Sequence, residues 1–326
     1  NITAYGINPG SGALTSLVTI TTRGGAASIA LAKGFAPVVY TPKFAYVTNE
    51  TSGTVSAYTI NASTGALTSV GAAVAAQAAP ESVAVTPSGK FAYVANYTSG
   101  NVSAYTINQI TGALTAVPGS PFAAGADTYS VNVDPAGKFA YAANFEANTV
   151  SVYTINPSTG ALTAVSGSPF ATVIGPYPVS IEYSGKFAYM TNNSPEGVSG
   201  YAIDPITGTI SLVAGSSIAA GVTPTDVKVD PWGRFAYAAN FGSNNISAYT
   251  IDPSTGVLTA VSGSPFAGGT NTYTVNIDPS GLFAYAVNYS SNNISAYTIN
   301  QTTGALTAVS GAPYAAGTRP TFIAVF

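Results

Sequence analysis

The sequence predicts an all-β, seven-bladed β-propeller, and three observations support this fold class. The chain repeats itself at a regular interval, each repeat contains four short strand-like phrases, and turns rich in Gly and Pro separate those phrases. A period of ~40–50 residues with this content is typical of propeller blades rather than of helical arrays. The phrase Phe-Ala-Tyr marks the period, spaced 47 residues once and 48 residues four times, and begins at Phe44, Phe91, Phe139, Phe187, Phe235 and Phe283.

The second complete repeat shows how one blade is built. Residues 82–85 form a short first strand, and Pro and Gly at the second and fourth positions of 86–89 favour a type I turn. Residues 90–96 follow as the second strand, 102–107 as the third and 112–117 as the fourth. The inner strands carry apolar residues on both faces, which is typical of sheets that pack between neighbouring sheets. Each blade is therefore predicted to be a four-stranded antiparallel sheet.

Counting the strands indicates how the ring closes. The third and fourth strands each occur seven times, the first strand reaches seven if residues 321–326 are counted, and the Phe-Ala-Tyr strand stops at six. We therefore expect one domain, 1–326, whose terminal segments pair to form a seventh blade shared between 1–20 and 318–326. The second strand of that blade is absent. It lies outside these 326 residues, or its two flanking strands pair directly, or a neighbouring chain donates an edge.

Composition excludes several classes of function. Charged residues are 6% of the chain, the net charge is −3, and there is no Cys and no His. These values argue against nucleic acid as a partner, and no apolar stretch is long enough to span a bilayer. The low charge and ten Asn-x-Ser/Thr sequons fit an exported protein, so we expect an extracellular or cell-surface location.

Short phrases in the repeat resemble a known family. Residues 46–49 read Tyr-Val-Thr-Asn, with close variants at 93–96, 189–192 and 285–288, and this resembles the YVTN-type β-propeller repeats. The chain also resembles the lactonase-like seven-bladed propellers, which include 6-phosphogluconolactonase-type and carboxymuconate-lactonizing enzymes. That resemblance implies the same propeller fold. Enzymes of the lactonizing kind are understood to use His and Arg residues, and no His position can be carried over here.

The residues themselves show no familiar catalytic arrangement. The sequence lacks a Gly-rich phosphate loop before a helix, a His/Cys metal cluster and a nucleophile elbow, so no catalytic residue, metal or cofactor is predicted. Most carboxylates stand at turn starts, where they are expected to cap backbone N–H groups. Five of the nine basic residues share one turn position and are expected on one rim: Lys43, Lys90, Lys138, Lys186 and Arg234. The other four are Arg23, Lys33, Lys228 and Arg319.

Departures from the repeat supply the candidate binding residues. Innermost strands are expected to border a central channel with Asn132, Ser180, Lys228 and Asn276, followed by Ala324 in the C-terminal strand, either as a polar ring around water or as hydrogen-bonded core groups. One face is expected to gather Glu81, Asp127, Tyr129, Tyr177, Asp226, Tyr273 and Arg319, with Tyr97, Phe145, Glu146, Glu196, Phe241 and Tyr289 from other loops. Aromatic groups beside amides suit sugars or a protein partner, although ordinary loop packing explains them as well.

Taken together, the residues favour a non-catalytic extracellular or cell-surface module that binds protein or carbohydrate or serves as a scaffold. Such a module would belong to a larger surface assembly, with self-assembly through the incomplete blade. The alternative is a lactonase-like hydrolase that acts on a sugar-acid lactone through a carboxylate and an Arg in the channel.

Overall fold

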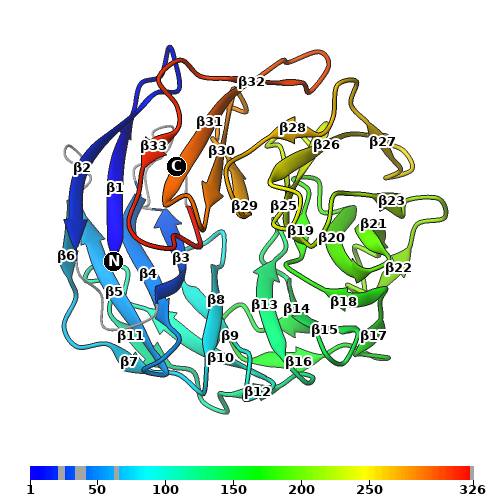
Figure 1. Cartoon of the computed structure of the whole chain (residues 1–326). Coiled ribbons are helices and arrows are strands. Elements are labelled where there is room, and N and C mark those ends of the chain that lie inside the picture. The colour runs from blue at the N-terminus through cyan, green and yellow to red at the C-terminus, as the bar shows by residue number, and fades with distance from the viewer. Residues whose placement is uncertain (21–25, 34–41, 62–65, 324–326) are drawn as a thin grey trace.

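The computed structural model describes residues 1–20, 26–33, 42–61 and 66–323, and in these ranges the regular structure consists of strands and turns. The strands form seven antiparallel sheets arranged around a common centre, which is the propeller-like arrangement expected from the repeat (Figure 1). No helix that would be long and apolar enough to cross a membrane is found in the described ranges.

Six sheets follow one pattern. In five of them the path holds four consecutive strands, and in the sixth the first strand is divided into two short strands that both pair with the second. In all six a further two-residue strand pairs with the third strand of the path. The first two of these sheets contain β3 (Ala26–Lys33), β4 (Pro42–Asn49), β5 (Thr54–Ile60), β6 (Leu67–Ser69) and β7 (Val74–Ala75), then β8 (Pro80–Val85), β9 (Phe91–Asn96), β10 (Asn101–Ile107), β11 (Leu114–Ala116) and β12 (Phe122–Ala123).

The next two contain β13 (Thr128–Val133), β14 (Phe139–Asn144), β15 (Thr149–Ile155), β16 (Leu162–Ala164) and β17 (Phe170–Ala171), then β18 (Ile174–Pro176), β19 (Ser180–Ile181), β20 (Phe187–Ser194), β21 (Glu196–Ile203), β22 (Ile210–Leu212) and β23 (Ile218–Ala219). The last two contain β24 (Pro224–Val229), β25 (Phe235–Asn240), β26 (Asn245–Ile251), β27 (Leu258–Ala260) and β28 (Phe266–Ala267), then β29 (Thr272–Ile277), β30 (Phe283–Asn288), β31 (Asn293–Ile299), β32 (Leu306–Ala308) and β33 (Tyr314–Ala315).

The repeated Phe and Tyr of the second strand join each sheet to the next. Tyr93 is fully buried, and its hydroxyl donates to the carbonyl oxygen of Gly160, in the following sheet, at 2.9 Å. Phe44 packs against Gly112 in the same way. Gly112 has φ +78°, and a Cβ atom there would lie 2.4 Å from Cδ1 of Phe44, so glycine is required both by backbone conformation and by the close approach. The period of the sequence is therefore the period of the contacts between sheets.

The Asn that ends each second strand also has a structural role. Asn96 is fully buried, and its Nδ2 donates to Asn101 Oδ1 at 2.8 Å and to Ser103 Oγ at 3.0 Å. This side chain therefore ties the loop after the second strand to the third strand. Sequons that begin at such positions are buried in the fold, namely those at Asn49, Asn96, Asn192 and Asn288.

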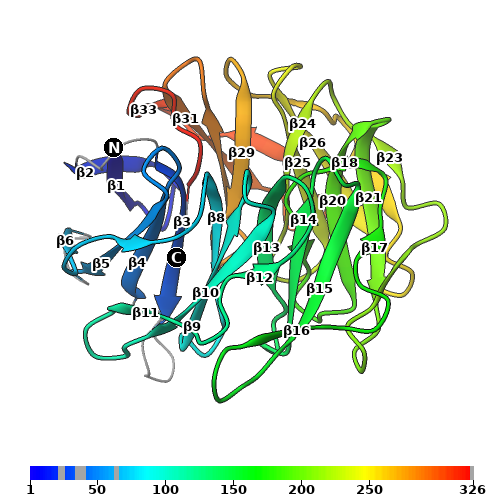
Figure 2. The same cartoon turned by 90° about the horizontal axis from the view of Figure 1, so that it is seen from below.

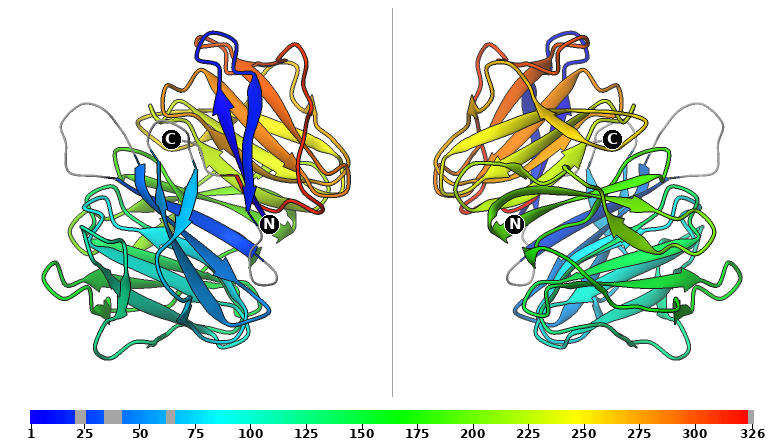
Figure 3. Two further views of the ribbon diagram at one scale, coloured as in Figure 1. Left: turned by 90° about the vertical axis from the view of Figure 1, so that its left-hand side faces the viewer. Right: turned by 90° about the vertical axis from the view of Figure 1, so that its right-hand side faces the viewer.

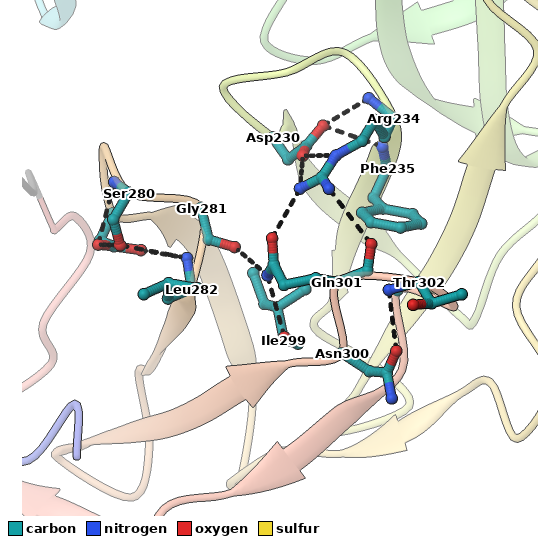
Figure 4. A network of polar contacts seen from close by, with 12 residues as sticks. Asp230, Arg234, Phe235, Ser280, Gly281, Leu282, Ile299, Asn300, Gln301 and Thr302 are labelled. Atoms are coloured by element: carbon teal, nitrogen blue, oxygen red, sulfur yellow. Dashed lines mark hydrogen bonds and ion pairs between the residues drawn. The ribbon is translucent and has the colours of Figure 1, made fainter. Parts of the chain in front are cut away.

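The turns between first and second strands form a rim, and charged side chains on this rim contact neighbouring sheets. Arg234 forms an ion pair with Asp230 at 2.9 Å and donates to the side-chain oxygen of Gln301 at 3.0 Å, in the next sheet (Figure 4). The Asp230 carboxylate also accepts from the backbone N–H groups of Arg234 and Phe235 at 2.6 and 3.0 Å. This confirms the expectation that turn carboxylates cap backbone groups, and it leaves Arg234 engaged in structure.

The N-terminal sheet contains two strands, β1 (Ile2–Ile7) and β2 (Leu14–Ile20), and lies between the β3–β7 and β29–β33 sheets (Figures 2 and 3). On one side the Tyr285 hydroxyl donates to the Gly12 carbonyl at 3.1 Å, repeating the contact between the other sheets. On the other side Ile2 packs with Val47 and Tyr58. Among the described residues β1 pairs with β2 alone, and residues 324–326 of the expected terminal segment 318–326 lie outside the described ranges.

Candidate active site at the centre of the ring

One residue in each of four first strands is set apart by an irregularity of the ladder. In β8, β13, β24 and β29 the register shifts at the second residue, which makes Glu81, Tyr129, Thr225 and Tyr273 the extra residues of β-bulges. A bulge re-aims a side chain relative to the faces of its sheet. Tyr177 occupies the corresponding place between β18 and β19, next to Pro178, which has no N–H for the ladder.

These irregularities bring side chains together across the centre of the ring. The hydroxyls of Tyr129 and Tyr273 lie 2.8 Å apart, although the residues are separated by 144 positions, or three repeats. Their strands, β13 and β29, lie on different sides of the centre (Figure 1). Tyr177 contacts Tyr129 edge-on, with ring centroids 5.1 Å apart. We call Glu81, Tyr129, Tyr177 and Tyr273 the central cluster.

A second set of aromatic residues surrounds the central cluster. They directly follow the buried Asn of the second strand, and each backbone N–H donates to the residue that precedes the first strand of the same sheet, as in the Phe145 N–H to Asp127 carbonyl bond of 2.9 Å. The ring centroids of Phe145 and Tyr177 lie 5.0 Å apart. The other members of the set, Tyr97, Phe241 and Tyr289, contact Tyr129 or Tyr273 at centroid distances of 6.0 to 6.2 Å. The aromatic residues expected on one face are thus gathered around its centre.

Glu81 is the acidic member of the central cluster. Burial, together with the neighbouring carboxylate of Glu50, raises the pKa of Glu81 to about 7. Burial raises the pKa of Tyr273 to about 12 and that of Tyr129 well above its ordinary value, and the charge of Glu81 adds to both shifts. The cluster therefore combines a carboxyl group that titrates near neutral pH with phenol hydroxyls that stay protonated and can donate hydrogen bonds.

Arg319 and Asp127 flank this arrangement. The Arg319 guanidinium lies over the Tyr289 ring, 5.6 Å from its centroid, and the residue is exposed. Burial raises the pKa of Tyr97 to about 12, and the nearby Asp127 carboxyl adds to this shift. Both residues have positive φ, 49° and 54° respectively, and both precede a first-strand segment.

Asp226 and Lys228 belong to the interior rather than to the face on which Asp226 was expected. Asp226 is buried, its Oδ1 lies 3.2 Å from Lys228 Nζ, and its Oδ2 accepts from the Val275 N–H at 3.3 Å. Burial raises the pKa of Asp226, and the Lys228 charge opposes that shift. Ser82 makes the corresponding contact with the next sheet three blades earlier, so Asp226 replaces a serine in a link between sheets, and Thr225 takes the bulge position.

The asparagines expected around the channel also join neighbouring sheets. Asn132 Nδ2 donates to the Val179 carbonyl, and Asn276 Nδ2 donates to the Ile323 carbonyl, both at 2.9 Å. Ser180 accepts from the Val229 N–H at 3.3 Å. Of the two interpretations left open by the sequence, hydrogen-bonded core groups describe these three residues better than a free polar ring. Ala324 lies outside the described residues.

Some residues of the site were missed or cannot be placed. Glu50 was not predicted, although it follows a second-strand Asn as the surrounding aromatic residues do, and that shared position was a usable signal. Arg23 lies outside the described ranges, and the side chain of Lys33 is not described. In the described part of the chain no three His, Cys, Asp or Glu side chains form a group that could hold a metal ion.

Comparison with known proteins places this chain in a family. The family model described as "Lactonase, 7-bladed beta-propeller" matches residues 1–128 and 130–324. The chain belongs to this lactonase family. No curated protein matches this chain.

Solved structures share its fold. A proposed 6-phosphogluconolactonase of Bacteroides fragilis NCTC 9343 has a TM-score of 0.82 and 22% identity, covering 96% of this chain and 91% of that chain. A second from Bacteroides uniformis ATCC 8492 has a TM-score of 0.82 and 21% identity, covering 98% and 93%. The periplasmic gluconolactonase of Pseudomonas aeruginosa has a TM-score of 0.79 and 19% identity, also covering 98% and 93%.

These findings correct the expectation of a non-catalytic binding or scaffold module. That expectation was wrong because it rested on the absence of His, whereas the family model that matches nearly the whole chain is a lactonase model. Lack of His excludes only an imidazole base. A carboxyl group whose pKa is raised by burial can do the same work, and burial is not visible in the composition.

Proposed function

We propose that this lactonase-family propeller is a hydrolase that opens a sugar-acid lactone at the central cluster, with Glu81 as the general base. The observation that supports this proposal most strongly is the position of Glu81, a carboxyl group with a pKa of about 7 among tyrosines that meet across the ring. A base whose pKa lies near the working pH is the most effective for proton transfer. The match of the family model over nearly the whole chain supports the same reaction class.

The chemistry assigned to the cluster is one addition and one elimination. Ionised Glu81 takes a proton from water as the water oxygen forms a bond to the lactone carbonyl carbon. The Tyr129 and Tyr273 hydroxyls form a pair in which one donates to the other, so one O–H remains to donate to the developing oxyanion. The ring C–O bond then breaks, and the departing oxygen receives the proton from Glu81, which is thereby ionised again as at the start. Lactone and water become a hydroxy acid, and the new carboxylic acid loses its own proton to solvent.

The test is hydrolysis of glucono-1,5-lactone by the wild type and by Glu81→Gln, with the spontaneous rate in buffer subtracted. The amide keeps the size of the side chain but cannot accept the proton, so we expect kcat to fall by roughly 10²–10⁴-fold. Glu146→Gln is the matched control, because Glu146 is an exposed carboxylate of the same face. Wild-type turnover equal to the buffer rate, or full activity in Glu81→Gln, contradicts the proposal.

We also propose that residues 1–326 form one domain of seven blades built on a four-stranded plan, the seventh shared between 1–20 and 318–326 and lacking its second strand. Support comes from the N-terminal sheet, which contacts the last complete sheet through Tyr285 and Gly12 and the first through Ile2 and Val47. Location outside the cell, a protein partner and self-assembly through the incomplete blade stay predictions. The mass of the native protein in dilute solution checks the last of these.

A further inference from the structure

Three aromatic side chains form a compact group on one side of the central cluster. Phe241, Tyr273 and Tyr289 contact one another, with ring centroids 6.0 to 6.1 Å apart in all three pairs. Tyr273 reaches the centre of the ring through its hydroxyl, whereas Phe241 and Tyr289 stand on the loops that follow β25 and β30. The group therefore begins at the central cluster and continues one ring beyond it.

Asn271 holds the two outer rings of this group in place. Its carbonyl oxygen accepts from the Tyr289 N–H at 2.9 Å, and its Nδ2 donates to the Phe241 carbonyl oxygen, in the preceding sheet, at 3.1 Å. Its Oδ1 accepts from the Ser290 hydroxyl at 2.6 Å. Ala79, at the same place in the β8–β12 sheet, can offer only the first of these bonds. A surface that is fixed before binding loses less conformational freedom when a ligand arrives.

Arg319 supplies hydrogen-bond donors at the edge of the group. Its backbone N–H donates to Asn292 Oδ1 at 2.7 Å, and its guanidinium lies over the Tyr289 ring, 5.6 Å from the centroid. Arg319 is exposed, and the Phe241 and Tyr289 side chains are each partly exposed. We call Phe241, Tyr289 and Arg319 the outer subsite.

The outer subsite has the chemistry that a sugar ring needs. A pyranose presents C–H groups on its faces, which pack on aromatic side chains, and hydroxyls around its edge, which accept hydrogen bonds from a guanidinium. This sugar is not the ring that reacts, because the reacting lactone carbonyl lies at the Tyr129–Tyr273 hydroxyl pair. The outer subsite thus has room in the argument for a second ring, joined to the first.

We infer that the outer subsite binds the second sugar of a disaccharide lactone, whose lactone ring lies at the central cluster. This inference rests on the proposed lactonase function and names its substrate class, a sugar lactone that carries a further glycosyl group. Phe241, Tyr289 and Arg319 act as specificity determinants, whereas the proton transfer belongs to Glu81.

The experiment compares kcat/KM for glucono-1,5-lactone with kcat/KM for cellobiono-1,5-lactone and maltobiono-1,5-lactone, which carry a second glucose in two different linkages. The spontaneous rate in buffer is subtracted from each. We expect the wild type to favour at least one disaccharide lactone by roughly tenfold. The preference should fall toward unity in Tyr289→Ala, persist in Tyr289→Phe, which keeps the ring, and shrink in Arg319→Gln, which loses the guanidinium.

Phe145→Ala is the matched control. Phe145 holds the same loop position as Tyr289 in another sheet, but it packs on Tyr177, with ring centroids 5.0 Å apart, on the other side of the central cluster. Phe145→Ala should therefore keep the preference for the disaccharide lactone. An equal loss of preference in Phe145→Ala and Tyr289→Ala contradicts the assignment to the outer subsite, and so does a preference that survives both Tyr289→Ala and Arg319→Gln.

The wild type alone separates the inference from the proposed function. Turnover of glucono-1,5-lactone with no preference for either disaccharide lactone overturns the inference and leaves the lactonase function standing. No turnover of any of these lactones overturns the proposed function, and the inference falls with it. Neither result depends on a variant that must fold.

Discussion

Replacing Glu81 with Gln is expected to stabilise the fold at alkaline pH while it removes activity. The pKa of Glu81 rises from its ordinary 4.5 to about 7, mainly through burial, so the folded state holds its proton where the unfolded state has released it. Stability therefore falls as pH rises from 4.5 to about 7 and stays low above that range. At about 1.4 kcal/mol per tenfold change in the ionisation equilibrium, the ionised carboxylate costs about 3 kcal/mol, and less to the extent that solvent reaches it.

Urea denaturation at about pH 8 and about pH 5 measures this cost. Glu81→Gln should be more stable than the wild type by about 2–3 kcal/mol at the higher pH and nearly equal to it at the lower pH, because the amide carries no charge at either. The exposed Glu146→Gln should show no difference at both values. If the stability gain of Glu81→Gln is the same at the two pH values, the raised pKa is not its cause and the case for Glu81 as a base near neutrality fails.

Three further outcomes follow from the site and the packing. The kcat/KM of the wild type should rise with pH through about 7 as Glu81 ionises, and Glu50→Gln should move this limb to lower pH in a pH–rate profile; an unmoved limb would mean that Glu50 does not act on Glu81. Tyr273→Phe, which removes one hydroxyl of the pair, should lower kcat by roughly 10–100-fold with little change in the urea midpoint, and unchanged kcat would exclude that hydroxyl as a donor. Gly112→Ala should lose more stability in urea than Gly215→Ala, because both need positive φ, at about 1–2 kcal/mol, and only the first meets a phenylalanine ring; equal losses would contradict the proposed close packing.

Much of the fold was readable because one pattern recurs. Phe91, Tyr93 and Asn96 predicted a buried second strand, and the structure shows each of them packed or bonded as its neighbours in the repeat are. Asp230 predicted a capped turn for the same reason, since a turn carboxylate acts on N–H groups only a few residues away. Turn chemistry depends on residues a few positions apart, and the repeat is visible in their order along the chain. A single sequence contains both kinds of information.

The candidate site depended on information of another kind. Tyr129 and Tyr273 were expected on the same face, yet nothing in their order along the chain shows that their hydroxyls meet at 2.8 Å across the ring. Asp226 was assigned to that face, and a one-residue bulge at Thr225 puts it inside, beside Lys228.

The acid–base character of the site arose only in three dimensions. In the sequence Glu81 looks like any other glutamate. Its pKa of about 7 comes from burial and from Glu50, which lies in the preceding repeat. Repetition along the chain therefore specified the blades, because each strand is defined by its own residues and turns. Closure of those blades around one centre decided the chemistry, because desolvation and the approach of distant charges exist only after the sheets have packed.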